Sequence, residues 1–225
     1  MKTFVIKNEK DLEKYKDDLG YHIKGNAEFE YSAEFTGRLL VDGYLYIKAG
    51  WSIEAGGSIE AGWSIEAGWF IEAGEYIKAG GYIKAGEYIE AGGSIEAGWF
   101  IEAGEYIKAG WSIKAGGSIE AGGSIKAGGS IEAGGSSGII AGLSITCKTT
   151  LLFGLRAFAG VCSWKDITDE DKTITCGKLE KGTIEYGILK ETGLPEEKKK
   201  GENQKGKVVK IRLSDGQILT GEFVE

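Results

Sequence analysis

The residues that could do chemistry are few, and they lie far apart in the sequence. His22 is the single histidine among 225 residues and has no visible partner, so we expect it to be a surface residue. The three cysteines, Cys147, Cys162 and Cys176, show no C-x-x-C spacing, which indicates reduced thiols rather than a metal cluster or a disulfide framework. The sequence contains no P-loop, no dinucleotide-binding glycine motif and no nucleophile elbow. It therefore predicts a protein without cofactor, metal or catalytic residues, and not an enzyme.

A six-residue repeat fills the middle of the chain and must position whatever the surface carries. Between residues 46 and 135, fifteen hexads share one form: Ser, Tyr or Phe, then Ile, then Glu or Lys, then Ala, Gly, and finally Gly, Trp or Glu. Isoleucine recurs from Ile47 to Ile131, and alanine follows two places later. In a strand these two side chains point to one side, and the charged residue between them points to the other. A period of six fits no helix, so the repeat predicts short stacked strands.

The glycine after each alanine predicts how the strands connect. Glycine permits a sharp corner, for which we expect a positive φ. Three corners close a triangle, so one coil takes eighteen residues, and each strand pairs in parallel with its equivalent about 4.8 Å away. The predicted fold is all-β, a three-sided parallel β-solenoid of seven or eight coils. We expect a right-handed coil because parallel crossovers nearly always have that hand.

The repeat continues in degenerate form on both sides of the regular hexads. Upstream, its apolar positions are Ile23, Phe29, Phe35 and Val41. Downstream, the extra residues at 136–138 shift the phase by two, and the pattern resumes at Ile139. These limits predict a solenoid over residues 21–160, an N-terminal strand–helix cap over residues 1–20, and a C-terminal β module over residues 161–225.

The N-terminal cap is expected because the first coil would otherwise expose core and an unpaired strand edge. Asn8 is a suitable N-cap for an amphipathic helix. That helix would place Leu12, Tyr15 and Leu19 on one side, and Gly20 would end it.

The C-terminal module is expected to be β-structure. Two strand-like segments, Thr173–Leu179 and Thr183–Lys190, precede a loop that begins at Pro195. A hairpin follows, with strands over residues 208–213 and 217–224 and a turn at Asp215 and Gly216.

Charged side chains form three columns when the coils are stacked at eighteen residues. The first alternates in sign at every step: Glu60, Lys78, Glu96, Lys114 and Glu132. The second alternates until its last pair: Lys48, Glu66, Lys84, Glu102 and Glu120. The third mostly does not alternate: Glu54, Glu72, Glu90, Lys108 and Lys126. Each opposite pair contributes roughly a few tenths of a kcal/mol, so the columns assist the register while the isoleucines supply the stability.

Variation between hexads is confined to their outward positions. Residues 46–111 carry all the Trp, Tyr and Phe of the regular hexads, whereas residues 112–135 carry only Ser and Gly at the outward uncharged places. Stacking at eighteen residues gathers aromatic rings and carboxylates on one side. We call this set the acidic-aromatic face; it consists of Trp51, Trp69, Phe70, Glu72, Glu87, Tyr88, Glu90, Glu105 and Tyr106.

Two interpretations of this face stay open. Stacked aromatic rings stabilise neighbouring strands, and tryptophans at the corners could simply cover the glycines. Alternatively, the face binds a partner, because exposed aromatic residues are frequent binding anchors and a monomer rarely leaves a large apolar patch idle.

Three protein families resemble this sequence to different degrees. Hexapeptide acyltransferases also stack six-residue strands, but they place a small residue four after the aliphatic one, where this chain has Gly57, Trp63, Glu75 or Glu87. They also use a histidine base, and His22 lies outside the regular hexads. These departures argue against acyl transfer. Bactofilins, which are short-strand β-helices that polymerise end to end, are more similar, but the extra segments at both ends should block such stacking.

A looser resemblance links the chain to hexapeptide-type repeat proteins of phages and mobile elements. It rests on the short start at residues 1–20, the low-variety repeat, and the tail around Ile174-Thr175-Cys176-Gly177. Some solenoids of that kind inhibit nucleic-acid enzymes by presenting an acidic rod. The resemblance thus implies a phage-encoded inhibitor of a nucleic-acid-binding defence enzyme, of the anti-CRISPR or DNA-mimic type. A self-assembling, bactofilin-like scaffold is the alternative.

The net charge of −7 sets the expected partner. It suits a protein with a basic surface and disfavours direct binding to nucleic acid or anionic lipid. No apolar run is long enough for a membrane helix, and the N-terminus does not read as a signal peptide, so we expect a cytoplasmic protein, in the host cytoplasm if a phage encodes it. Self-association into a homo-oligomer stays open.

Overall fold

The computed structural model describes residues 1–195 and two further strands, residues 208–212 and 218–222. It divides into two compact units, Met1–Pro195 and Glu196–Glu225. In the second unit, β28 (Val208–Arg212) and β29 (Ile218–Glu222) pair antiparallel, which confirms the predicted hairpin strands. The predicted turn at Asp215 and Gly216, and the loop after Pro195, lie outside the described residues.

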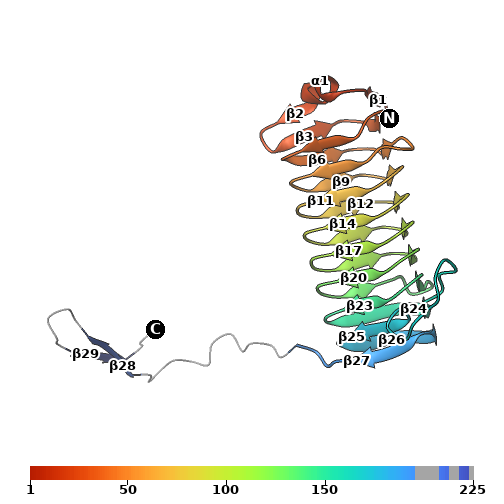
Figure 1. Cartoon of the computed structure of the whole chain (residues 1–225). Helices are drawn as coiled ribbons and strands as arrows, with labels where there is room; N and C mark the ends of the chain where they lie inside the picture. Colours follow the sequence, from red (N-terminus) through yellow and green to blue (C-terminus); the bar gives the residue numbers. More distant parts are fainter. Residues whose placement is uncertain (196–207, 213–217, 223–225) are drawn as a thin grey trace. The chain divides into compact units, whose positions relative to one another are not determined.

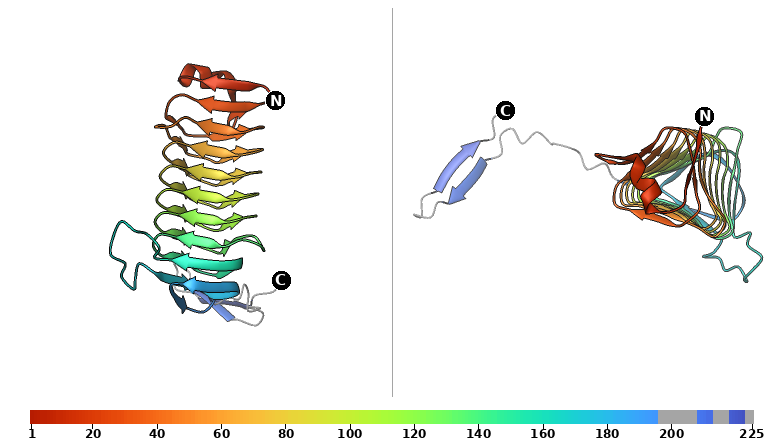
Figure 2. Two further views of the ribbon diagram at one scale, coloured as in Figure 1. Left: turned by 90° about the vertical axis from the view of Figure 1, so that its right-hand side faces the viewer. Right: turned by 90° about the horizontal axis from the view of Figure 1, so that it is seen from above.

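The first unit is a parallel β-solenoid of about ten coils stacked roughly 18 residues apart (Figure 1). This confirms the predicted fold class, although seven or eight coils were expected. Viewed along its axis, the solenoid has three sides (Figure 2, right). Successive strands along the chain lie on face 1, face 2 and face 3 in turn.

The strands of each face follow in coil order. Face 1 consists of β3 (Gly20–Ile23), β6 (Arg38–Val41), β9 (Ile59–Ala61), β12 (Ile77–Ala79), β15 (Ile95–Ala97), β18 (Ile113–Ala115), β21 (Ile131–Glu132) and the first part of β24 (Thr150–Ala159). Face 2 consists of β1 (Thr3–Ile6), β4 (Asn26–Phe29), β7 (Leu45–Ile47), β10 (Ile65–Ala67), β13 (Ile83–Ala85), β16 (Ile101–Ala103), β19 (Ile119–Ala121), β22 (Ile139–Ala141) and the end of β24. Face 3 consists of β5 (Ala33–Phe35), β8 (Ile53–Ala55), β11 (Ile71–Ala73), β14 (Ile89–Ala91), β17 (Ile107–Ala109), β20 (Ile125–Ala127), β23 (Ile145–Cys147), β25 (Thr173–Cys176) and β27 (Ile188–Glu191).

Isoleucine and alanine line the interior, as the alternation predicts. Every isoleucine from Ile53 to Ile131 in the regular hexads is 0% exposed, and the alanines two places later are at most 7% exposed. Each isoleucine packs against the equivalent residue of the next coil, as Ile71 does between Ile53 and Ile89. Burying one such side chain contributes about 1.5–3 kcal/mol. A continuous isoleucine column therefore dominates the stability.

In the regular hexads only Gly50 has the positive φ expected after the alanine, and the glycines from Gly56 to Gly134 are required for another reason. Positive φ angles occur only at Gly20, Gly50, Gly160, Gly182, Gly187 and Gly193 among the described residues, so no glycine between residues 53 and 134 needs one. The constraint is contact between coils. A Cβ atom on Gly110 would lie 1.9 Å from the carbonyl oxygen of Gly92, one coil earlier. The coils approach so closely at this corner that only a hydrogen fits.

The phase of the repeat breaks once more than the sequence suggests. Leu45, not Ile47, lies opposite Ile65, so Ile47 occupies an alanine position and two extra residues fall between residues 48 and 51. Ile47 keeps the six-residue spacing by coincidence, which hid this shift. Lys48 therefore does not start the second charge column; Tyr46 lies opposite Glu66, and Lys48 forms an ion pair with Glu30.

The N-terminal cap differs from the predicted helix. α1 (Glu9–Leu12) begins at the N-cap Asn8, but it passes into η1 (Glu13–Tyr15) and then into β2 (Lys16–Asp17), which pairs antiparallel with β3. Leu12 is buried in the core, whereas Leu19 is 66% exposed. The helical turns are far too short to cross a lipid bilayer, and the other elements described in the chain are strands.

Parallel pairing extends past both ends of the predicted range of residues 21–160. β1 pairs with β4 before the first predicted coil. After residue 160, β25, β26 (Lys178–Tyr186) and β27 add further parallel strands. The inward residues of β25 are Ile174 and Cys176, both 0% exposed, so a cysteine replaces the alanine of the regular hexads there.

Candidate partner-binding face

Face 3 brings the nine residues of the acidic-aromatic face together. They lie on or immediately before β8, β11, β14 and β17, four consecutive coils. The observed register is the predicted spacing of eighteen residues, since Glu72 lies opposite both Glu54 and Glu90. The rigid backbone thus fixes the spacing of their side chains.

Three aromatic rings of this face form a parallel stack. The ring centroids of Phe70 and Tyr88 are 4.7 Å apart with an interplanar angle of 4°, and those of Tyr88 and Tyr106 are 4.8 Å apart at 5°. The spacing equals that of neighbouring strands, so the rings follow the coils directly. Each tyrosine hydroxyl donates a hydrogen bond toward the previous coil, Tyr88 to Glu72 at 3.3 Å and Tyr106 to Glu90 at 3.4 Å. Face 2 contains a shorter stack of Tyr82 and Phe100.

Carboxylates lie next to one another on this face instead of alternating with lysines. Glu34, Glu54, Glu72 and Glu90 occupy equivalent positions on four successive strands. Desolvation raises the pKa of Glu54, and the charges of Glu72 and Glu34 raise it further. The first charge column differs, because there Lys114 pairs with Glu132 at 3.1 Å.

Burial and nearby carboxylates also raise the pKa values of the tyrosines in the stack. Desolvation, followed by the charge of Glu72, raises the pKa of Tyr88 well above its ordinary value. Desolvation and Glu90 raise the pKa of Tyr106. Both hydroxyls therefore remain protonated and keep donating to the carboxylates at neutral pH.

Large side chains mark the corner that leads into this face. The backbone amide of Trp69 donates to the carbonyl of Trp51 at 3.0 Å, and that of Glu87 donates to Trp69 at 2.8 Å. Trp51 and Trp69 are 41% and 49% exposed. Glu105 continues the same corner toward the C-terminus. Two exposed indoles therefore flank the row of carboxylates.

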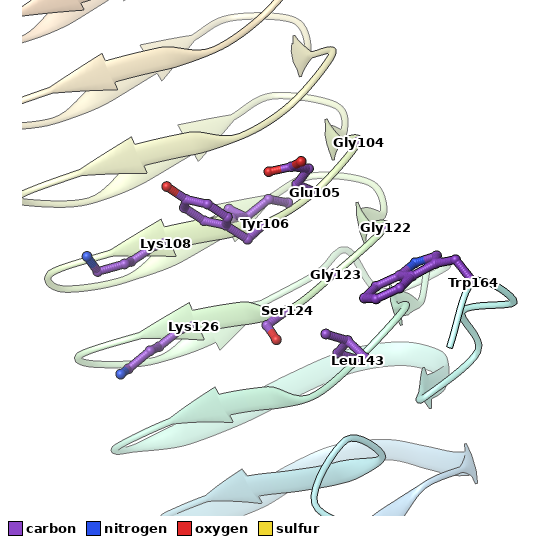
Figure 3. A pocket seen from close by; sticks show the side chains of 11 residues that line it. Gly104, Glu105, Tyr106, Lys108, Gly122, Gly123, Ser124, Lys126, Leu143 and Trp164 are labelled. Atoms are coloured by element: carbon purple, nitrogen blue, oxygen red, sulfur yellow. The ribbon is translucent and has the colours of Figure 1, made fainter. Parts of the chain in front are cut away.

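Some residues that border the C-terminal end of the face were not predicted from the sequence. A groove of about 710 Å³ lies next to Tyr106, and its other lining residues include Lys126, Leu143 and Trp164 (Figure 3). Trp164 comes from the loop between β24 and β25, which projects from a corner of the solenoid (Figure 2, right). Its one sequence signal is its position as a lone tryptophan in a charged segment.

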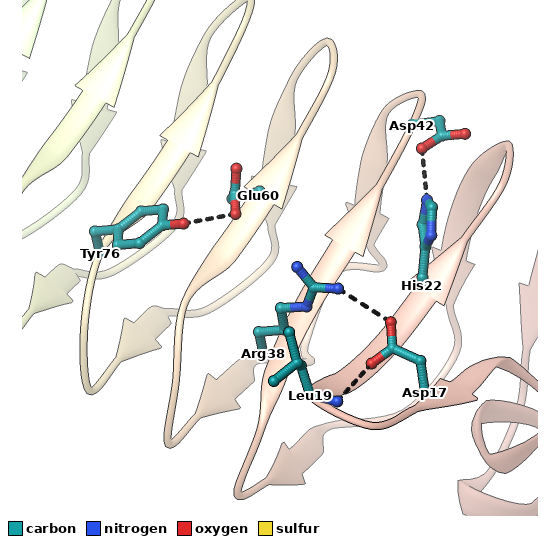
Figure 4. Close-up of polar contacts among 7 residues, drawn as sticks. All are labelled: Asp17, Leu19, His22, Arg38, Asp42, Glu60 and Tyr76. Atoms are coloured by element: carbon teal, nitrogen blue, oxygen red, sulfur yellow. Dashed lines mark hydrogen bonds and ion pairs between the residues drawn. The ribbon is translucent and has the colours of Figure 1, made fainter.

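His22 has a partner, contrary to expectation. Its Nε2 atom lies 2.8 Å from Oδ1 of Asp42, on the next coil (Figure 4). Nearby, Arg38 and Asp17 form a similar link between coils at 3.1 Å. Both pairs connect successive turns, as does the hydrogen bond from Tyr76 to Glu60. Within the described residues, no three His, Cys, Asp or Glu side chains are arranged to hold a metal ion.

The cysteines are free thiols, and two of them face the core. Cys147 occupies the position that Ala127 holds one coil earlier. Burial raises the pKa of Cys147 to about 12, and Cys176 adds to the shift. Desolvation also raises the pKa of Cys176. Cys162 is only partly buried.

This shift predicts that Cys147 weakens the fold at high pH. A thiol with a raised pKa in the folded state stabilises the fold below its unfolded pKa, near 9, and that contribution is lost as the pH rises toward 12. The free energy of unfolding, measured with guanidinium, should therefore fall more between pH 8 and pH 11 for the native chain than for Cys147→Ala, by about 2 kcal/mol. Alanine is the matched control because it holds this position in other coils. Equal falls would show that the thiol is accessible in the folded state.

No protein-family model, no curated protein and no solved structure matches the chain. Its functional interpretation therefore depends on the geometry of face 3.

Proposed function

We propose that the chain is a non-enzymatic binding protein whose acidic-aromatic face docks on a basic surface of a protein partner. The observation that carries this proposal is the row Glu34, Glu54, Glu72 and Glu90. Like charges directly opposite on neighbouring strands destabilise a sheet. Because the first charge column of the same solenoid alternates in sign, stability does not explain the row.

The aromatic residues strengthen the proposal. Trp and Tyr are enriched among the residues that carry most of the free energy of binding. Trp51 and Trp69 are exposed beside the carboxylates, so a partner could bury the indoles while its basic side chains pair with the glutamates. Such complementarity also accelerates association and makes it sensitive to salt.

A nucleic-acid-binding groove is the partner surface that fits best. Grooves of this kind are lined with Lys and Arg that neutralise rows of phosphates. A rigid row of carboxylates spaced by the coils would compete for the same side chains. We therefore propose an inhibitor of a nucleic-acid-binding enzyme, such as a nuclease of a bacterial defence system that a phage protein would block.

The covered N-terminal end argues against the alternative, an end-to-end filament. Leu12 of α1 is buried in the core, and Phe4 of β1 packs edge to face on Tyr15 of η1 with centroids 5.4 Å apart. Stacking of coils between molecules would have to displace these segments. Light scattering at increasing concentration tests this directly.

The proposal predicts that binding of the partner depends on face 3 and weakens as the salt concentration rises. Bacterial proteins captured by the native chain would be compared with those captured by Trp69→Ala/Tyr88→Ala and by a face 2 control, Tyr82→Ala/Trp99→Ala. The partner should bind the face 3 variant at least about tenfold more weakly, because two binding anchors are lost, and should bind the control normally.

The identity of the captured protein is part of the test. It should bind nucleic acid, and nucleic acid should displace the native chain from it. A partner whose affinity is unchanged by the face 3 variant, or one that is acidic, would contradict the proposal.

A further inference from the structure

The aromatic stack on face 3 has an open end. Phe70, Tyr88 and Tyr106 stack at intervals of 4.7 and 4.8 Å. On the next coil, β20, the equivalent residue is Ser124, so the outer side of the Tyr106 ring has no ring against it at that level. A flat ring bound beside Ser124 would become the fourth member of the stack.

A groove occupies this place. Its volume of about 710 Å³ is within the range of small-molecule sites. Gly122 and Gly123 line it with backbone alone, and Leu143 and Trp164 close the side opposite Tyr106 (Figure 3). Trp164 is 66% exposed at this position. The groove thus offers aromatic side chains at both ends, with the small side chain of Ser124 and the glycine backbone between them.

Two lysines stand beside the groove. Lys108 and Lys126 lie directly opposite each other on β17 and β20, and they are the one Lys–Lys pair among the paired strands of residues 1–195. Both line the groove. The ammonium of Lys108 is drawn toward Glu90 on the preceding coil, whereas Lys126 has no acidic partner among the described residues. An anion bound here would relieve the repulsion between the two like charges.

We infer that this groove binds a nucleoside phosphate. The base would stack on Tyr106 and against Trp164, and the phosphate would lie at Lys126 and Lys108. Base stacking on aromatic side chains and phosphate pairing with lysine are the two interactions that such ligands require. This site goes beyond the proposed partner binding and does not depend on it.

A second groove provides an internal control. It has a similar volume, about 700 Å³, and the same plan, with Tyr76 on one coil, Gly92, Gly93 and Ser94 on the next, and Trp111 closing it. Its charges differ, however. Its lining includes Glu60 and Glu96; Glu60 accepts the Tyr76 hydroxyl at 2.7 Å, and Lys78 faces Glu96 at 3.8 Å. Without an unpaired lysine, this groove should not hold a phosphate.

The test is titration of the full chain with AMP, GMP, CMP and UMP by calorimetry. At least one should bind saturably with submillimolar affinity, and the corresponding nucleoside and ribose 5-phosphate should each bind at least about tenfold more weakly. Tyr106→Leu and Trp164→Leu should each weaken nucleotide binding about tenfold, whereas Tyr106→Phe should retain it. Lys126→Gln should weaken the nucleotide about tenfold but leave the nucleoside unchanged.

The matched variants Tyr76→Leu, Trp111→Leu and Lys78→Gln should leave binding unchanged. Absence of saturable binding below 1 mM for all four nucleotides would overturn the site. Equal losses in the two sets of variants would also overturn it. Neither result would bear on the protein partner, which is tested by Trp69→Ala/Tyr88→Ala.

Discussion

Replacing Gly110 with alanine should lower the free energy of unfolding by about 3 kcal/mol. The added Cβ would lie 1.9 Å from the carbonyl oxygen of Gly92, and neither atom belongs to a flexible side chain. To relieve this steric clash, the two coils must move apart, which would stretch the parallel hydrogen bonds on both sides of the corner. Guanidinium unfolding followed by circular dichroism measures the loss.

Gly135→Ala is the matched control for this substitution. No atom lies within 4 Å of a Cβ built at Gly135, and its φ is not positive. Its stability should therefore stay within about 0.5 kcal/mol of the native value. If the two variants were equally stable, close contact between coils would not be the reason for the recurring glycine.

Ile89→Ala should also destabilise the solenoid, by about 3 kcal/mol. Ile89 is 0% exposed and lies between Ile71 and Ile107 in the isoleucine column of face 3. The coils above and below are fixed by their strand pairing, so the surrounding side chains cannot collapse into the space that is left. The loss therefore includes a cavity in addition to the lost burial of the side chain.

Ile140→Ala is the control for Ile89→Ala, because it makes the same change at an outward position. Ile140 is at the middle of β22 and is 38% exposed, so no closed cavity forms when it is truncated. We expect a loss below about 1 kcal/mol, measured by the same unfolding experiment. Similar losses at the two positions would contradict the placement of the isoleucine column in the interior.

Prediction of the fold succeeded where the pattern is local. Alternation within Ile53–Ala55 and its repeats assigns the inward side chains, and the period of six sets the register between coils. The four coils of the acidic-aromatic face were predicted correctly for that reason, because no insertion falls between Trp51 and Tyr106. The expected reason for the glycines was wrong from Gly56 to Gly134, because contact between coils depends on how closely they approach and not on the local dihedral angle.

Prediction failed where distant segments meet. The phase break after Ile47 is visible only from the pairing of β7 with β10, because an isoleucine happens to occupy an alanine position there. The helix expected to run to Gly20 ends early because Lys16 and Asp17 pair with β3 instead. The position of Trp164 depends on a loop that projects from a corner and returns to the groove.

A period of six and alternation along short strands were enough to predict the three-sided solenoid, its core and the spacing of the acidic-aromatic face. The limits of the solenoid, the close approach of its corners and the side chains around the open end of the aromatic stack became evident only in the folded chain. Those features arise from contacts between residues that are far apart in the sequence, and such contacts leave no periodic signal.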